Sequence, residues 1–258
     1  MCFASEAVSG GKETGPGFRI APKMESRDKS AFPFSVHPDP TLPSITDPET
    51  FILANTRLQV VPHTPEISLW LADEITPIWR MTEEELGEIG LPPPFWAFAW
   101  SGGQGLARWI LDTPDEVAGK RVLDFATGSG LVGVAAMKAG AAQVVCADID
   151  PFCGAAVTLN ARANGVALTF TDVDLLDGPP PEVDVICAGD VCYEKPMTER
   201  VLAWLAKARA NGTRVLIGDP HRTYFPKEGL EFLAEYRVPT TRELEDFEIK
   251  RSSVWAMP

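Results

Sequence analysis

The feature that most restricts the fold of this chain is a glycine-rich turn that follows a short apolar strand. Gly128, Gly130 and Gly133 are spaced as Gly-x-Gly-x-x-Gly, directly after an apolar stretch at residues 122–123. An amphipathic helix is predicted to begin at Leu131. Such a turn lets the backbone approach a ligand closely and directs the N–H groups of the helix start toward it. The turn therefore predicts a ligand site at the end of a strand.

From Phe95 onward, the sequence pattern alternates between strands and helices. Helices are predicted over Gly103–Leu111, Leu131–Ala139, Phe152–Asn164, Thr198–Ala208 and Lys227–Ala234, and strands over Arg121–Phe125, Gln143–Ala147, Leu168–Phe170, Val183–Ala188, Arg214–Ile217, Tyr236–Pro239 and Ser253–Met257. This alternation is typical of a parallel sheet with helices on both faces. We expect an α/β, Rossmann-like doubly wound fold with a mostly parallel, seven-stranded sheet. Its ligands would bind at the carboxyl edge of the strands.

The first 93 residues follow a different pattern. Residues 1–35 are rich in Gly, Ser, Lys and Glu without periodicity, so we expect them to be disordered, with Met24 as an alternative start. Residues 36–93 are expected to form an N-terminal extension with helices. There, Thr50–Val61 fits either a short helix or a strand, and apolar residues from Ile67 to Gly90 recur at roughly helical spacing. The α/β domain is expected over residues 94–258.

Composition restricts the partners of the chain. It has 36 acidic and 23 basic residues, a net charge of −13, so its surface repels the phosphate backbone of nucleic acids and favours a basic or lysine-bearing protein. No apolar run approaches the roughly 20 residues of a membrane helix. With three histidines and no Cys-x-x-Cys pair, the sequence predicts no metal site. Its five cysteines are expected to be reduced and mostly structural. Without an organellar signal, we expect a cytoplasmic, bacterial protein.

Acidic residues recur where the predicted strands end. Asp124 ends the first strand, Asp148 follows the second, Asp172 follows the third and Asp190 the fourth. Because parallel strands end at one edge of a sheet, these carboxylates are expected to share that edge. Asp148 stands 20 residues after Gly128, where dinucleotide-binding folds place a ribose-binding acid.

Asp124 distinguishes between two ligands. A dinucleotide places a pyrophosphate over the glycine turn, where a carboxylate would repel it. S-adenosylmethionine carries no phosphate but an ammonium and a sulfonium cation, which an acid favours. Asp124 is expected to bind its amino-acid part, directly or through water, and Asp148 its ribose hydroxyls. Asp172 and the N–H of Val173 are expected to contact its adenine. A nicotinamide-dependent oxidoreductase remains the alternative.

The same residues carry a family resemblance. Asp124-Phe-Ala-Thr-Gly128-Ser-Gly130, followed by Asp148-Ile-Asp-Pro151, resembles class I (seven-β-strand) methyltransferases that use S-adenosylmethionine. Asp190-Val-Cys-Tyr193 resembles the Asp-x-x-Tyr motif of the protein-lysine methyltransferases within that class. The stretch Pro94–Gln104 is similar to the lysine methyltransferases of the electron transfer flavoprotein β subunit. This resemblance implies that subunit as the protein substrate.

The resemblance also implies a set of site residues. Cofactor contacts are implied for Asp124, Gly128, Gly130, Asp148, Asp172 and Val173, with Trp100 and Gly103 added from the N-terminal side. Asp190 is expected to orient the lysine ammonium and Tyr193 to bond or cover the amine. Alternatively, Asp190 caps the following segment, and Tyr193 and Trp100 are core residues. Another protein substrate, such as a ribosomal protein, and a cofactor-binding chaperone without catalysis also remain open.

Overall fold

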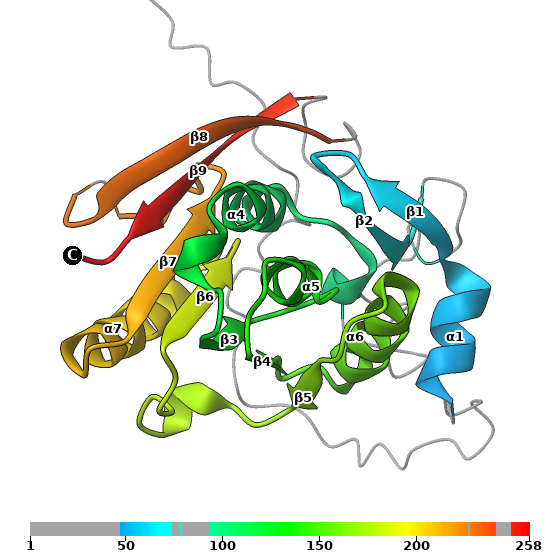
Figure 1. Ribbon diagram of the computed structural model, residues 1–258, viewed down its shortest axis with the longest axis horizontal. Coiled ribbons are helices and arrows are strands. Elements are labelled where there is room, and N and C mark those ends of the chain that lie inside the picture. The colour runs from blue at the N-terminus through cyan, green and yellow to red at the C-terminus, as the bar shows by residue number, and fades with distance from the viewer. Residues whose placement is uncertain (1–46, 74–77, 79–92, 227, 241–248) are drawn as a thin grey trace, which may run out of the picture. The chain divides into compact units, whose positions relative to one another are not determined.

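The computed structural model describes residues 47–73, 78, 93–226, 228–240 and 249–258, all within one compact unit, Thr41–Pro258. The residues expected to be disordered, 1–35, lie outside these ranges. Seven strands form one sheet in the order β5-β4-β3-β6-β7-β9-β8 (Figure 1). Their bounds are β3 Arg121–Phe125, β4 Gln143–Ala147, β5 Thr169–Thr171, β6 Val185–Gly189, β7 Arg214–Asp219, β8 Glu231–Pro239 and β9 Ile249–Ala256. The first five are parallel, and β9 runs antiparallel to both β7 and β8.

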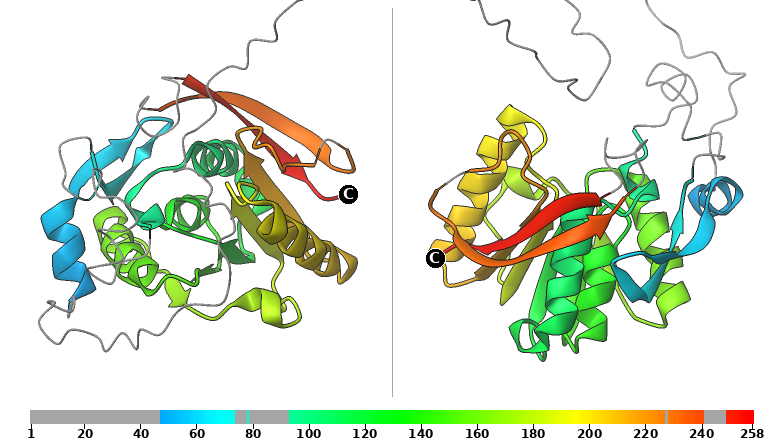
Figure 2. Two further views of the ribbon diagram at one scale, coloured as in Figure 1. Left: turned by 180° about the vertical axis from the view of Figure 1, so that it is seen from behind. Right: turned by 90° about the horizontal axis from the view of Figure 1, so that it is seen from above.

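Helices cover both faces of the sheet (Figures 1 and 2). The helices α4 (Ser101–Asp112), α5 (Leu131–Lys138) and α6 (Pro151–Asn164) lie on one face, and α7 (Lys195–Ala210) lies on the other. Three single-turn helices lie in the connecting segments: η1 (Phe95–Ala97) before α4, η2 (Pro114–Glu116) between α4 and β3, and η3 (Leu175–Asp177) between β5 and β6. Strand residues alternate between the two apolar cores, since Val122 packs on the α4–α5 side and Leu123 on the α7 side.

The N-terminal extension contains α1 (Pro48–Asn55) and a hairpin of β1 (Arg57–Val61) and β2 (Thr64–Leu71). The helix predicted from Ile67 is therefore wrong as far as residue 71. Ile67, Leu69 and Leu71 alternate with more exposed residues, which is the period of a strand, and all three are buried. Most of the rest of that prediction, up to Gly90, lies outside the described residues.

The hairpin is fixed to α6 by two asparagines. Asn164 accepts the N–H of Ser68 at 3.1 Å and donates to its carbonyl at 2.6 Å. Asn160, which is fully buried, accepts the N–H of Trp70 at 2.7 Å and donates to the carbonyl of Ser129 in the glycine turn at 2.8 Å. One side chain therefore connects β2 to the turn.

A second prediction fails near the C-terminus. The helix predicted over Lys227–Ala234 is absent over residues 228–234, because Glu231 onward belongs to β8. Phe232 and Ala234 pair with Trp255 and Val254 of β9, across a register shift between them. Pairing with β9 decides the conformation here, and that strand lies too far along the sequence for a local pattern to reveal.

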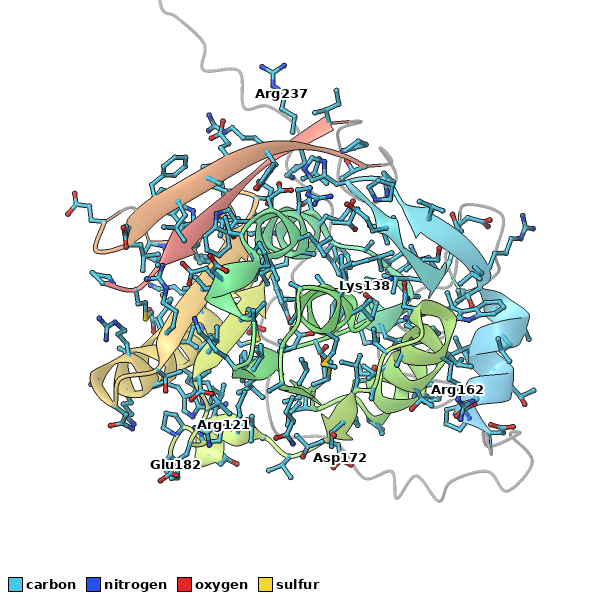
Figure 3. All side chains as sticks on the ribbon, viewed as in Figure 1. Arg121, Lys138, Arg162, Asp172, Glu182 and Arg237 are labelled. Atoms are coloured by element: carbon cyan, nitrogen blue, oxygen red, sulfur yellow. The ribbon has the colours of Figure 1, made fainter. Side chains whose placement is uncertain are left out.

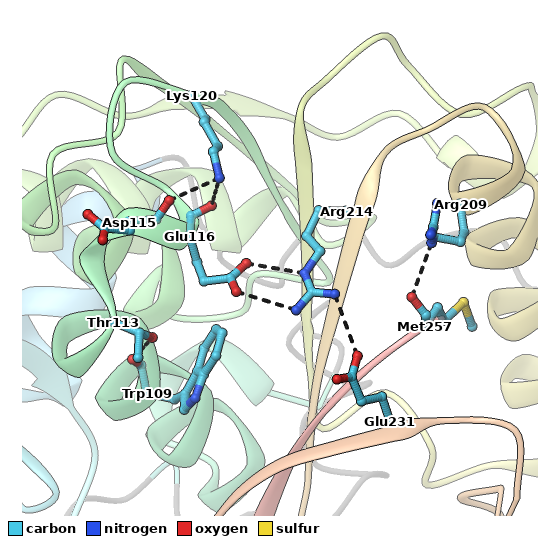
Figure 4. Close-up of polar contacts among 9 residues, drawn as sticks. All are labelled: Trp109, Thr113, Asp115, Glu116, Lys120, Arg209, Arg214, Glu231 and Met257. Atoms are coloured by element: carbon cyan, nitrogen blue, oxygen red, sulfur yellow. Dashed lines mark hydrogen bonds and ion pairs between the residues drawn. The ribbon is translucent and has the colours of Figure 1, made fainter.

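The amino edge of the sheet, opposite the glycine turn, carries an ion-pair network (Figure 4). Arg214 at the start of β7 donates to both carboxylate oxygens of Glu116, at 3.2 and 3.3 Å, and lies 3.9 Å from Glu231. Lys120 donates to the backbone carbonyls of Asp115 and Glu116.

Within the described residues, no helix is long and apolar enough to span a membrane.

The start of α4 packs directly on the backbone of β6 and β7. A Cβ atom at Gly102 would stand 2.6 Å from the carbonyl oxygen of Gly218, and one at Gly189 would stand 2.9 Å from the Cα of Gly103. A Cβ at Gly218 would collide with the carbonyl of Gly102. Glycine at these positions allows a helix-to-strand approach that a side chain would prevent.

We predict that Gly102→Ala destabilises the protein by about 1–3 kcal/mol, because the added methyl group overpacks this contact. Gly103→Ala is the matched control. Its Cβ would meet Leu131 Cδ2 at 3.9 Å, an ordinary contact, and alanine favours the helix by up to about 1 kcal/mol. Urea unfolding measures both variants, and equal stabilities would contradict the close approach.

Candidate active site

The glycine turn is organised by the buried carboxylate of Asp124, whose side chain is 1% exposed. Its Oδ2 accepts the hydroxyl of Thr127 and the N–H of Gly133 at 2.9 Å. Burial raises its pKa to about 7, against these hydrogen bonds. Gly130 begins α5 at φ 81, a left-handed conformation that glycine adopts readily. Asp124 thus holds the turn from the buried side, and its Oδ2 is hydrogen-bonded to Thr127 and Gly133.

Asp148 fixes the same turn at Gly128. Its Oδ2 accepts the N–H of Gly128 at 2.9 Å, and its Oδ1 accepts the N–H of Asp150 at 3.1 Å. Asp150 caps α6 by accepting the N–H of Phe152, while its Oδ2 is buried without a hydrogen-bond partner. Burial raises the pKa of Asp150 to about 6. An orphaned carboxylate oxygen beside the turn favours a ligand that brings hydrogen-bond donors or positive charge.

Asp172 and Val173 follow β5 and are exposed, with Asp172 at the periphery in Figure 3. The N–H of Val173 faces the hydroxyl of Thr171 at 3.4 Å. An open pocket of about 620 Å³ extends from Asp172 between β5, α6 and α1, and Glu49 and Leu53 of α1 line it. The extension therefore contributes to the surface beside the expected adenine contacts.

Asp190 lies in the loop after β6, is 8% exposed and has a left-handed backbone at φ 62. Its Oδ2 accepts the N–H of Gly102 at 2.6 Å and thereby caps the start of α4. Trp100, the N-cap residue of that helix, makes no side-chain cap of its own. The Oδ1 of Asp190 accepts a hydrogen bond from Nε of Arg222 at 2.7 Å and forms an ion pair with Nη2 of the same guanidinium, also at 2.7 Å. Asp190 is thus engaged inside the protein rather than presented to solvent.

Tyr193 and Trp100 are both more exposed than Asp190. The Tyr193 side chain is 47% exposed and its ring contacts that of Phe95. The indole Nε1 of Trp100 donates to the Phe95 carbonyl at 2.9 Å. Trp100 is partly buried, so neither ring is a core residue.

The chain resembles known methyltransferases over most of its length. Over 84% of its residues it is 37% identical to the electron transfer flavoprotein beta subunit lysine methyltransferase of Xenopus laevis, covering 89% of that protein. The rat protein of that name is 36% identical over 74% of this chain and 76% of its own length, and the human one 34% over 84% and 82%. The family described as ribosomal protein L11 methyltransferase (PrmA) matches residues 108–191.

The chain belongs to the family of electron transfer flavoprotein beta subunit lysine methyltransferases. The expected enzyme class, a methyltransferase, is thereby confirmed, and so is the mostly parallel seven-stranded sheet. The expectation of a bacterial, cytoplasmic protein is wrong, because these relatives come from vertebrates.

The structure brings most of the predicted residues of this methyltransferase together. Hydrogen bonds join Asp148 to Gly128 and Asp124 to the turn, and Gly103 packs against Gly189 at the end of β6. Asp172 and Val173 are exposed in the loop after β5, next to Thr171, whose carbonyl accepts the N–H of Asp148 at 3.1 Å.

Three further residues of the site are not among those predicted from the sequence: Arg222, Phe95 and Asn160. Arg222 bonds Asp190, the carbonyl of Phe95 accepts from Trp100, and Asn160 holds the glycine turn. The position of Arg222 was the one signal that could have identified it: it lies three residues after Asp219, at the end of the predicted strand that follows the one before Asp190.

The four cysteines in the described part, Cys146, Cys153, Cys187 and Cys192, are free and buried, which confirms the expectation of structural thiols for them. Cys2 lies outside the described residues. Burial raises the pKa of each of the four thiols, so they are poor nucleophiles at neutral pH.

Asp219 ends β7 beside this site and is 1% exposed. Its Oδ1 accepts the backbone N–H of Arg222 at 2.7 Å, and its Oδ2 is buried without a hydrogen-bond partner. Burial, and then the charge of Asp190, raise its pKa to about 7. The folded protein therefore holds a proton on Asp219 at pH values where the unfolded chain, with a pKa of about 3.9, has lost it.

We predict that Asp219→Asn gains stability relative to the native protein as the pH rises. Between about pH 4 and about pH 7, the unfolded native chain binds fewer protons than the folded one, so native stability falls with pH. The substituted asparagine does not titrate, so the variant escapes this fall, by up to a few kcal/mol. Urea unfolding at pH 5 and pH 8 tests this, and a pH-independent difference between the two proteins would sink the assignment.

Proposed function

We propose that this chain transfers methyl groups from S-adenosylmethionine to lysine side chains of the electron transfer flavoprotein β subunit. The observation that carries the proposal is the acidic carboxyl edge, where Asp148 holds Gly128 and Asp150 has an orphaned oxygen. Relatives that are named for that reaction, and that the chain matches over most of their length, support the substrate. The net charge of −13 suits a lysine-bearing partner.

The residues present fit S-adenosylmethionine better than a dinucleotide. Asp148 bonds the turn directly, and the buried Asp124 and the neighbouring Asp150 add two more acidic groups. Acidic groups here repel a pyrophosphate but attract a sulfonium and an ammonium. We assign Asp148 to the ribose hydroxyls, and Asp172 and Val173 to the adenine. When bound, the cofactor supplies a methyl group on a cationic sulfur that a neutral amine can attack in line.

The protein must therefore present the lysine as a neutral amine. An exposed lysine ammonium has a pKa of about 10.4, so desolvation or neighbouring positive charge must lower it. Tyr193, half exposed beside Phe95, offers a ring surface that removes water from the ammonium and so lowers its pKa. Positioning against a reactive donor then provides much of the rate.

We expect tritiated S-adenosylmethionine and the purified protein to label the β subunit of recombinant electron transfer flavoprotein, with the label mapped to lysine by mass spectrometry. A lysate lacking the enzyme is labelled in parallel. Label confined to another lysate protein, such as ribosomal protein L11, would replace the substrate and keep the enzyme class. Intact cofactor binding without any labelled protein would favour a non-catalytic, chaperone-like role and contradict the proposal.

We predict that Asp148→Asn weakens binding of S-adenosylmethionine roughly tenfold or more, because a charged acceptor is lost from both the ribose and the Gly128 N–H. Asp115→Asn is the matched control, an exposed residue on η2 at the opposite edge of the sheet. Calorimetry measures both. Equal affinities would remove Asp148 from the cofactor site.

A further inference from the structure

Four aromatic side chains form a continuous group, which we call the aromatic cluster: Phe95, Phe98, Trp100 and Tyr193. Ring centroids are 5.8 Å apart between Tyr193 and Phe95, 5.9 Å between Phe95 and Trp100, and 5.7 Å between Trp100 and Phe98. Phe95 and Tyr193 are each 47% exposed. Large apolar side chains left open at an active-site edge are suited to contact a ligand.

The segment that carries Phe95 lies beside the glycine turn. A Cβ at Gly128 would stand 3.6 Å from the carbonyl oxygen of Phe95, so this segment passes directly by the glycine turn. Tyr193 approaches from the loop after β6, three residues beyond Asp190. Two separate segments thus place exposed rings beside the residues that hold the turn.

The electrostatic surroundings of the cluster favour a cation. Burial, followed by the negative charges of Asp148, Glu194 and Asp190, raises the pKa of Tyr193. The guanidinium carbon of Arg222 already lies 6.0 Å from the centroid of a Trp100 ring. Aromatic faces within a negative field attract organic cations, and more strongly where the cation is shielded from water.

Asp190 is poorly suited to bind a lysine ammonium. A lysine ammonium would have to compete with Arg222, which makes two contacts of 2.7 Å with Oδ1, and with the Gly102 N–H at 2.6 Å from Oδ2, for a side chain that is only 8% exposed. A carboxylate in contact with an ammonium also raises its pKa, which opposes the loss of a proton that the reaction requires. Aromatic rings stabilise the ammonium less, and the desolvation they bring favours the neutral amine.

We infer, building on the proposed function, that Phe95 and Tyr193 receive the target lysine side chain. Asp190 is then a positioning residue, which holds the start of α4 through Gly102 and places Arg222 against Trp100. This assigns a substrate role to Phe95, and it moves the ammonium-binding role expected for Asp190 to the rings.

The first arm of the test measures binding of n-butylammonium, a mimic of the lysine side chain, by saturation-transfer NMR, with 1-butanol as the uncharged reference. We expect Phe95→Leu and Tyr193→Leu each to weaken butylammonium binding roughly threefold or more. Phe232→Leu is the matched control, an exposed ring (54%) on β8 that packs against Trp255. Equal binding by all three variants and the native protein would overturn the inference.

The second arm removes the ion pair without changing the net charge. We expect the double variant Asp190→Asn with Arg222→Gln to be less stable yet to bind butylammonium within about twofold of the native protein. If butylammonium binding disappears in this variant and survives in Phe95→Leu, Asp190 and not the rings binds the ammonium. If the double variant does not fold, the leucine variants decide the matter alone.

Methylation kinetics separate this inference from the proposed function. Phe95→Leu should raise KM for the flavoprotein severalfold with little change in kcat and in S-adenosylmethionine affinity. An unchanged KM in that variant would contradict the inference while leaving the proposed function intact. Absence of methyl transfer by the native protein would overturn the proposed function, whereas butylammonium binding would still report on the rings.

Discussion

The arrangement of the carboxyl edge depends on how closely the first turn of α4 approaches the backbone of β6 and β7. Glycines at 102, 189 and 218 permit that approach, and Asp190 completes it by capping the helix from another segment. The buried charge of Asp190 then requires Arg222, which follows β7. Three segments distant in sequence are thereby held together, and the segment that carries Phe95 is fixed over the glycine turn.

Much of this fold follows from short-range sequence patterns. The predicted bounds of β3 and β4 match the structure, because each strand has an apolar centre that begins after one polar residue and is followed closely by the acids and glycines of a turn. The glycine turn and the carboxylates beside it are equally predictable, since Asp124 and Asp148 follow directly from where those strands end. Parallel topology then brings them to one edge without further information.

Other features depend on partners that a local pattern does not contain. Trp70 and later apolar residues are spaced with a helical period, and this longer pattern predicts a helix. The alternation of Ile67, Leu69 and Leu71, which marks strand β2, is short and is hidden by it. The ion pair of Asp190 involves a residue 32 positions away, so the sequence reveals an acid at a strand end but not its partner. Its chemical role changes once that partner is known.

Asn160 makes the glycine turn dependent on residues from three regions of the chain. It bonds Trp70, 90 positions earlier, and Ser129, 31 positions earlier. During synthesis, the carbonyl of Ser129 lacks its amide partner until α6 has left the ribosome. The glycine turn is therefore completed late, and a fragment beginning at the α/β domain would leave the Oδ1 of Asn160 without the donor that β2 supplies.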